Sequence, residues 1–188
     1  MSHFRAIAFF VLIAMLIVAS CQNKGTQQYK TVKSTDYLTI IENEINKLRD
    51  ENLNLVIDDQ AVHFGSDSLD THNLKEVAAN HVLFLFFSYQ TCSPCIDQTV
   101  KYIKEVFPDY EKDNRIIFIS PDYPARFRRN CYGKKLLTLS TGALGIPLET
   151  KNVPFIFTLT KELTIDKLHV VNKNDFVKTL EFLKEINE

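Results

Sequence analysis

The chain has 188 residues, 45% of them hydrophobic, with 22 basic and 23 acidic side chains and a formal net charge of −1 at pH 7. This balance argues against a nucleic-acid partner, because proteins that bind nucleic acids usually carry a clear basic excess. The apolar content and the length suit one folded domain with one core.

The first 21 residues have the pattern of a bacterial lipoprotein signal peptide. Arg5 precedes an uncharged stretch from Ala6 to Ala19, which is short for crossing about 30 Å of hydrocarbon but suits a signal-peptide core. The segment 16–21, LIVASC, resembles a lipobox, in which cleavage leaves a cysteine whose sulfur carries lipid. We therefore expect residues 1–20 to be removed and Cys21 to be lipidated. An ordinary secretory signal, or an anchoring helix with an incidental cysteine, is the alternative.

Lipidation at Cys21 predicts a bacterial membrane-anchored lipoprotein whose domain faces the periplasm. Several acyl chains, palmitate among them, would hold it on the membrane stably. Removal of the signal peptide leaves 21 basic and 23 acidic residues, a net charge of −2. Residues 21–34 are polar and predict a flexible tether after the lipidated cysteine, and residues 35–188 form the predicted domain.

The domain begins with helix and hairpin signals. Apolar residues recur at helical spacing from 35 to about 51 and predict an amphipathic helix. The short apolar pieces 53–57 (LNLVI) and 61–64 (AVHF) predict a small hairpin, and a short helix is expected around 74–79.

The next elements alternate between strand and helix. The apolar run within 81–88 lacks alternation, which predicts a central strand covered by helices on both faces. An apolar stripe after Cys95 predicts a helix that stops at Pro108. A strand at 115–119 and a helix at 124–132 should follow.

The last third of the domain predicts an irregular stretch, a hairpin and a final helix. Strands are expected at 153–160 and 165–171, and helical spacing returns from Phe176 to Leu183. From residue 81 the order is strand, helix, strand, helix, strand, strand, helix, which indicates an α/β fold with a mixed sheet.

Two of the four cysteines stand three residues apart, between the predicted central strand and the following helix. At a helix start, unpaired N–H groups and the helix dipole favour a thiolate at Cys92, and Cys95 lies one turn further on. Pro94 fits because a first helical turn tolerates a missing N–H. Since a thiolate is the species that attacks a disulfide, the spacing favours a redox-active pair.

Metal binding and a structural disulfide are the competing interpretations of this pair. Structural zinc needs four ligands. The only further candidates are Cys131, His63, His72, His81 and His169, and they form no second paired motif. We therefore expect no metal and no bound cofactor, with a copper-handling site or an inert disulfide as the alternatives.

The sequence Cys92-Ser93-Pro94-Cys95 after a buried strand, with Val153-Pro154 opening a later one, resembles the thioredoxin fold. The resemblance covers roughly residues 70–188. It implies a three-layer α/β sandwich with a mixed central sheet, here with an N-terminal helical and hairpin extension. In that family the matching proline follows a cis peptide bond beside the reactive cysteine, so Val153 and Pro154 are the expected substrate-binding residues.

With the lipobox and the long insertion before Pro154, the chain is similar to membrane-anchored disulfide reductases of the TlpA kind. The resemblance implies that Cys92 attacks a disulfide in a protein substrate, that Cys95 resolves the mixed disulfide, and that a membrane dithiol carrier donates electrons. A disulfide oxidase or isomerase, or a non-catalytic binding lipoprotein, remains an alternative. A peroxidase is less favoured, because the Pro-x-x-x-Thr-x-x-Cys motif is absent.

Three positions depart from the family pattern. Thr91 stands where tryptophan usually precedes the first cysteine, Phe86 replaces a buried aspartate, and Gln98 replaces a frequent glutamate. No obvious carboxylate therefore remains to deprotonate Cys95, although Asp97 and Glu105 are nearby in sequence.

Cys131 and a basic cluster have no place in this scheme. Cys131 is predicted to be a buried free thiol, and the sharper alternative is that it traps a mixed disulfide or joins a second chain. Basic residues between 126 and 135 predict a solvated helix face, with docking to an acidic partner or to lipid headgroups as the alternative.

Overall fold

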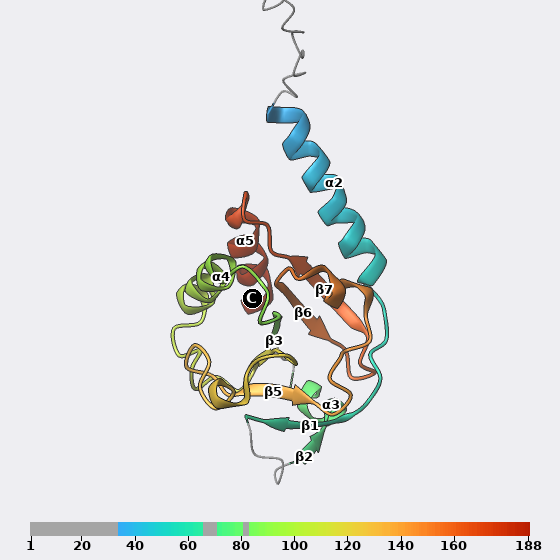
Figure 1. The fold of residues 1–188 in the computed structure, drawn as a ribbon, viewed down its shortest axis with the longest axis vertical. Coiled ribbons are helices and arrows are strands. Elements are labelled where there is room, and N and C mark those ends of the chain that lie inside the picture. The colour runs from blue at the N-terminus through green and yellow to red at the C-terminus, as the bar shows by residue number, and fades with distance from the viewer. Residues whose placement is uncertain (1–33, 66–70, 81–82) are drawn as a thin grey trace, which may run out of the picture. The chain divides into compact units, whose positions relative to one another are not determined.

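The computed structural model describes residues 34–65, 71–80 and 83–188 (Figure 1). The predicted signal peptide and Cys21 lie outside this part, so those predictions stand untested. The chain divides into two compact units, residues 1–38 and 39–188, and the second contains the sheet. Within the described ranges no helix combines the length and the apolar content that crossing a membrane requires.

The N-terminal extension has the predicted helix and a hairpin with a different first strand. Helix α2 covers Ser34–Asn52, and β1 (Ala61–Phe64) pairs antiparallel with β2 (Thr71–Asn73). The 53–57 segment was expected to pair with β1, but its backbone bonds instead to residues 163 and 165. The short helix expected around 74–79 is confirmed as α3 (Leu74–Ala78), which follows β2 directly.

In the part of the chain that the structure describes, seven strands form one mixed sheet in the order β2-β1-β5-β4-β3-β6-β7. Strand β3 (Leu83–Phe86) pairs parallel with β4 (Ile116–Ile119) and antiparallel with β6 (Phe155–Leu159). Strand β7 (Ile165–Val170) forms the predicted hairpin with β6, and β5 (Leu136–Leu139) lies between β4 and β1.

An apolar layer covers each face of the sheet. Helices α4 (Ser93–Val106) and α5 (Phe176–Asn187) pack on one face, and α3 with part of α2 packs on the other. Successive residues of β3 enter opposite layers, because side chains alternate across a strand. This explains the unbroken apolar run, and it confirms the thioredoxin-like three-layer α/β fold.

Two expectations between β4 and β6 were wrong. Strand β5 was not predicted, and the helix at 124–132 is reduced to a 3₁₀ turn, Ala125–Phe127. The helix cannot continue because the carbonyl of Arg128 accepts the N–H of Leu136 instead of a bond from the next helical turn. Tyr132 and Gly133 then reverse the chain with positive φ angles of 54° and 85°.

Candidate active site

The predicted site residues lie at one edge of the sheet. Cys92 is the N-cap of α4 and follows the carboxyl end of β3. Because β6 runs antiparallel to β3, with Phe155 opposite Phe86, the Val153-Pro154 segment meets the sheet at the same edge. The fold therefore brings the two cysteines and Val153-Pro154 to the same end of neighbouring strands.

The peptide bond before Pro154 corrects one expectation. The described ranges contain no cis peptide bond, so the cis bond that the resemblance implied is not observed. The chain turns into β6 at Asn152, which has a φ of 52° and ends the 3₁₀ turn Pro147–Lys151. Pro154 is nevertheless buried, and its carbonyl accepts the N–H of Val171 at 2.9 Å.

The two thiols differ in exposure. Both are free, but Cys92 is exposed whereas Cys95 is only 7% exposed. Cys95 donates its backbone N–H to the carbonyl of Cys92 at 3.0 Å, as the first turn of α4 requires. A substrate can therefore reach the Cys92 thiol from solvent. The Cys95 thiol is shielded from solvent and lies one helical turn after Cys92.

The local electrostatics give the two thiols opposite acidities. A hydrogen bond from the Cys95 side chain, followed by one from its backbone N–H, lowers the pKa of Cys92; Lys173 contributes in the same direction and Asp97 opposes it. Burial, with the hydrogen bond to Cys92 as the next cause, raises the pKa of Cys95 to about 11. Cys92 is therefore the more acidic of the two thiols, and Cys95 keeps its proton to higher pH and donates a hydrogen bond to the Cys92 sulfur.

The structure shows which side chains stand where the thioredoxin pattern has, or leads one to expect, a carboxylate near the second cysteine. Phe86 is buried and stacks on Phe155 with ring centroids 4.7 Å apart. Asp97 is exposed, and it accepts a hydrogen bond from the Tyr132 hydroxyl at 2.6 Å. An aromatic pair thus occupies the place where the resemblance leads one to look for an internal base.

The segment before Cys92 is fixed by a carboxylate that the sequence analysis missed. Asp122 accepts the backbone N–H of Tyr89 at 2.8 Å and the hydroxyl of Ser88 at 3.0 Å. The Thr91 hydroxyl accepts the N–H of Ser88 at 3.0 Å, so Thr91 closes this turn where the family has tryptophan. Since β3 and β4 are parallel, residues just beyond their carboxyl ends meet, and this rule could have identified Asp122.

Cys131 lies beneath an aromatic cluster on the face of the sheet that α4 and α5 cover. It is 5% exposed and hydrogen-bonds to the hydroxyl of Tyr123, whose ring lies 5.8 Å from that of Phe87. Burial raises the pKa of the Cys131 thiol, and burial together with the Cys131 contact raises that of Tyr123 to about 12. The predicted buried thiol is confirmed.

The basic cluster was expected to be one solvated helix face, and this expectation is wrong. Arg128 donates to the carbonyls of Tyr123 and Pro121 at 2.7 and 3.0 Å, and so fastens its own loop. Lys134 is 9% exposed and donates to the carbonyls of Tyr110 and Asp113 at 3.0 and 2.9 Å. These two cations have structural roles.

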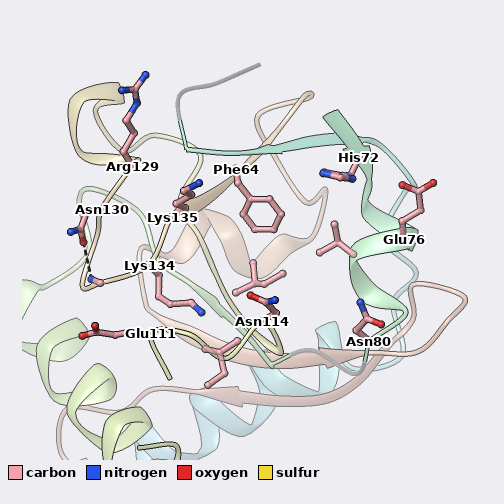
Figure 2. A pocket seen from close by; sticks show the side chains of 14 residues that line it. Phe64, His72, Glu76, Asn80, Glu111, Asn114, Arg129, Asn130, Lys134 and Lys135 are labelled. Atoms are coloured by element: carbon pink, nitrogen blue, oxygen red, sulfur yellow. Dashed lines mark hydrogen bonds between the residues drawn. The ribbon is translucent and has the colours of Figure 1, made fainter. Parts of the chain in front are cut away.

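Lys134 also lines a cavity of about 700 Å³ at the other edge of the sheet, where β4 and β5 begin (Figure 2). Figure 2 shows Phe64, His72 and Asn114 around the same space. The cavity contains none of the cysteines, so it is separate from the predicted redox site.

The histidines named as possible zinc ligands lie apart from the cysteine pair or outside the described part. His72 lines the cavity at the other edge, and His169 hydrogen-bonds to Thr179 at 2.9 Å while stacking on Phe182. In the ranges that the structure describes, no three His, Cys, Asp or Glu side chains gather so that they could hold a metal ion.

Comparison with known proteins identifies likenesses of fold. No protein-family model matches the sequence. No curated protein matches it. Among solved structures, a thioredoxin-like protein of Porphyromonas gingivalis is 17% identical, with 72% of this chain and 92% of that chain covered and a TM-score of 0.45.

Two further structures show how broad this likeness is. A secreted thiol-disulfide isomerase of Corynebacterium glutamicum is 14% identical, covering 69% of this chain and 85% of that one with a TM-score of 0.43. The mitochondrial 2-Cys peroxiredoxin of Plasmodium falciparum is 9% identical, covering 72% and 92% with a TM-score of 0.42. Likeness at this level concerns the path of the chain, so the chemistry has to be derived from this chain's own residues.

Proposed function

We propose that the protein is a thiol-disulfide oxidoreductase that reduces disulfides in protein substrates through Cys92 and Cys95. The observation that carries the proposal is the asymmetry of the pair. An exposed thiol with a lowered pKa stands beside a buried thiol whose pKa is raised to about 11. The Cys92 thiol is suited to attack a substrate disulfide, and the Cys95 thiol is suited to resolve the mixed disulfide afterwards.

The reaction begins when the Cys92 thiolate attacks one sulfur of the substrate disulfide. The substrate S–S bond breaks, the leaving sulfur takes a proton from water, and a mixed disulfide joins Cys92 to the substrate. Cys95 then loses its proton and attacks the Cys92 sulfur, and the second substrate sulfur leaves and is protonated. Two electrons have passed to the substrate, and the Cys92–Cys95 pair is left as a disulfide.

The first step prepares the second. The negative charge on Cys92 and its hydrogen bond to Cys95 both contribute to the raised pKa of Cys95. Forming the mixed disulfide removes the charge and weakens that hydrogen bond, so the pKa of Cys95 falls once a substrate is attached. Cys95 is thereby activated only when there is a mixed disulfide to resolve.

The remaining assignments complete the proposal. Val153 and Pro154, at the same sheet edge, would form the substrate-facing wall. A membrane dithiol carrier would return the pair to the reduced state. Cys21, carrying palmitate and other acyl chains, would anchor the protein to the membrane with its domain in the periplasm.

The test of direction is the equilibrium reduction potential of the Cys92/Cys95 pair. The full chain in detergent would be equilibrated with a glutathione series, and its free thiols would be counted by mass labelling. A value near or below about −230 mV supports a reductase, whereas one near −120 mV identifies an oxidant. The absence of reversible two-electron exchange would overturn the enzyme assignment in favour of a binding module, and tight stoichiometric Cu(I) binding by both thiols would then indicate copper handling.

The anchor has a separate test. Cells producing the full chain would be labelled with radioactive palmitate, beside cells producing Cys21→Ser. Label in the wild type that the variant lacks supports lipidation, and equal label in both overturns it.

A further inference from the structure

A row of aromatic side chains adjoins the attacking cysteine. Tyr89, Tyr123 and Phe127, here called the aromatic ledge, contact one another edge to face, with ring centroids 5.3 and 6.2 Å apart. Tyr89 is 56% exposed and Phe127 is 43% exposed. Large aromatic rings left this open on a folded domain are characteristic of interaction surfaces.

The ledge is held rigidly by bonds already described. Asp122 fixes the backbone of Tyr89, and Arg128 fixes the carbonyl of Tyr123 at 2.7 Å. The Tyr123 ring also packs edge to face on the buried Phe87, with ring centroids 5.8 Å apart. An ordered aromatic surface loses little conformational entropy when a partner binds, which favours its use in recognition.

A positive charge stands at the outer end of the ledge. The Arg126 guanidinium lies 4.7 Å from the centre of the Phe127 ring. Unlike Arg128 and Lys134, which are tied to carbonyls, Arg126 is exposed. An acidic side chain on a partner could therefore pair with Arg126 while an apolar side chain covers Phe127.

The ledge lies within reach of whatever is bonded to Cys92. Tyr89 is three residues before Cys92, so their α-carbons are at most about 11 Å apart. A polypeptide joined to Cys92 through its own cysteine could reach Tyr89 within about three residues, and Phe127, which lies beyond the ring contacts of 5.3 and 6.2 Å, within about six residues on one side of that cysteine. A small disulfide such as hydroxyethyl disulfide has no such extension.

We propose that the aromatic ledge and Arg126 recognise the substrate as a polypeptide whose reactive cysteine is flanked, within about six residues on one side, by an apolar or aromatic residue and an acidic residue. This inference rests on the proposed disulfide reductase function and names its substrate class. It makes Tyr89, Phe127 and Arg126 specificity determinants, distinct from the cysteines that exchange the disulfide.

The test compares two substrates with the full chain in detergent, with dithiothreitol as the reductant. One is hydroxyethyl disulfide, and the other is a synthetic peptide disulfide with Phe and Glu within about six residues of the cysteine. For Phe127→Ala and Arg126→Gln, the ratio of kcat/KM for the peptide to that for the small disulfide should fall about tenfold, mainly through KM. Phe127→Tyr should restore the ratio, and a peptide with Ser and Lys at the flanking positions should lose the advantage in the wild type.

Matched controls separate recognition from folding. Val177 is an exposed apolar residue on α5, 62% exposed, and Lys161 is an exposed cation on another loop. Val177→Ala and Lys161→Gln should leave the ratio unchanged. Ratios for the ledge variants equal to that of wild type would overturn the recognition proposal. If wild type reduced neither substrate, the proposed function itself would fail.

Discussion

The two edges of the sheet each hold a buried ionisable side chain with a shifted pKa. At one edge, burial raises the pKa of Cys95 to about 11, and at the other, burial lowers the pKa of Lys134. Cys95 lies beside an exposed thiol whose pKa is lowered, whereas the ammonium of Lys134 is tied to two backbone carbonyls. A shifted pKa therefore indicates chemistry only where the buried group faces a reactive, accessible partner; elsewhere it reflects the cost of a structural bond.

The largest expected effect comes from removing the attacking sulfur. Cys92→Ser should lower the rate of hydroxyethyl disulfide reduction more than about 1,000-fold, because a neutral hydroxyl does not replace a thiolate in exchange. Cys131→Ser is the matched control and should retain the rate, since Cys131 is buried with its pKa raised. A fully active Cys92→Ser variant would remove the difference between the two edges.

The second prediction concerns how the two thiols respond to pH. The ordinary pKa is 9.0, that of Cys92 lies below it, and that of Cys95 is about 11. A lowered pKa means that the thiolate is present at lower pH, so at pH 8 iodoacetamide should label Cys92 more than about 100-fold faster than Cys95.

Peptide mass mapping across a pH series checks this selectivity. The rate at Cys92 should reach half of its maximum below pH 9, and that at Cys95 should rise only as the pH approaches 11. In Cys92→Ser, labelling of Cys95 should begin at lower pH, because the thiolate charge that helps to raise its pKa is gone. Coincident profiles for the two cysteines in wild type would contradict the asymmetry.

A smaller effect is expected at the carboxylate that positions the loop. Asp122→Asn keeps the size of the side chain but replaces one of two accepting oxygens, which contact Ser88 and Tyr89. Lost order before Cys92 should lower kcat about tenfold, since charged hydrogen bonds contribute about 1.5–3 kcal/mol. Asp166→Asn, an exposed carboxylate on β7, should have no effect. An Asp122→Asn variant with unchanged kcat and an unchanged labelling profile at Cys92 would refute the positioning role.

The smallest effect on the rate of disulfide exchange is expected for Lys134, at the edge of the sheet opposite the cysteines. Its substitution should instead lower the stability of the fold substantially. Lys134→Met should leave the carbonyls of Tyr110 and Asp113 without their donor and reduce the free energy of unfolding by about 2–3 kcal/mol. Lys135→Met, at an exposed neighbour, should cost little. Urea unfolding and the exchange rate of the folded protein measure both quantities, and a loss of exchange without a loss of stability would contradict the structural role.

The fold could be predicted largely from local patterns. The unbroken apolar run of β3 and the apolar stripe of α4 are strong sequence signals, because the burial of one continuous segment produces each of them. Strand β5 was missed because its apolar stretch, LLTL, is short and includes a polar residue, and because its place in the sheet depends on neighbours far along the chain, Phe118 and Val62 among them. The expected helix at 124–132 is absent for a nearer reason, since the N–H of Leu136 bonds to the carbonyl of Arg128.

The residues of the candidate site also fall into two groups, those that a local motif predicts and those that only the topology of the sheet brings together. Cys92 and Cys95 could be named from their spacing, because the helix itself brings them together. Asp122 and the ledge residue Phe127 could not, because they come from a loop some 30 residues further on that only the parallel pairing of β3 and β4 brings to the cysteines. Their signal lies in topology and not in any local motif.

The stacking of Phe86 on Phe155 has a consequence for the lifetime of the covalent complex. In the proposed reaction this aromatic pair accepts no proton, so the proton of Cys95 would pass to water before the substrate is released. The linked state should therefore persist longer than in a protein with a built-in base, and acid quenching should preserve it. The unmodified protein could then serve as its own bait, with its natural substrates isolated by mass from the cells that make it.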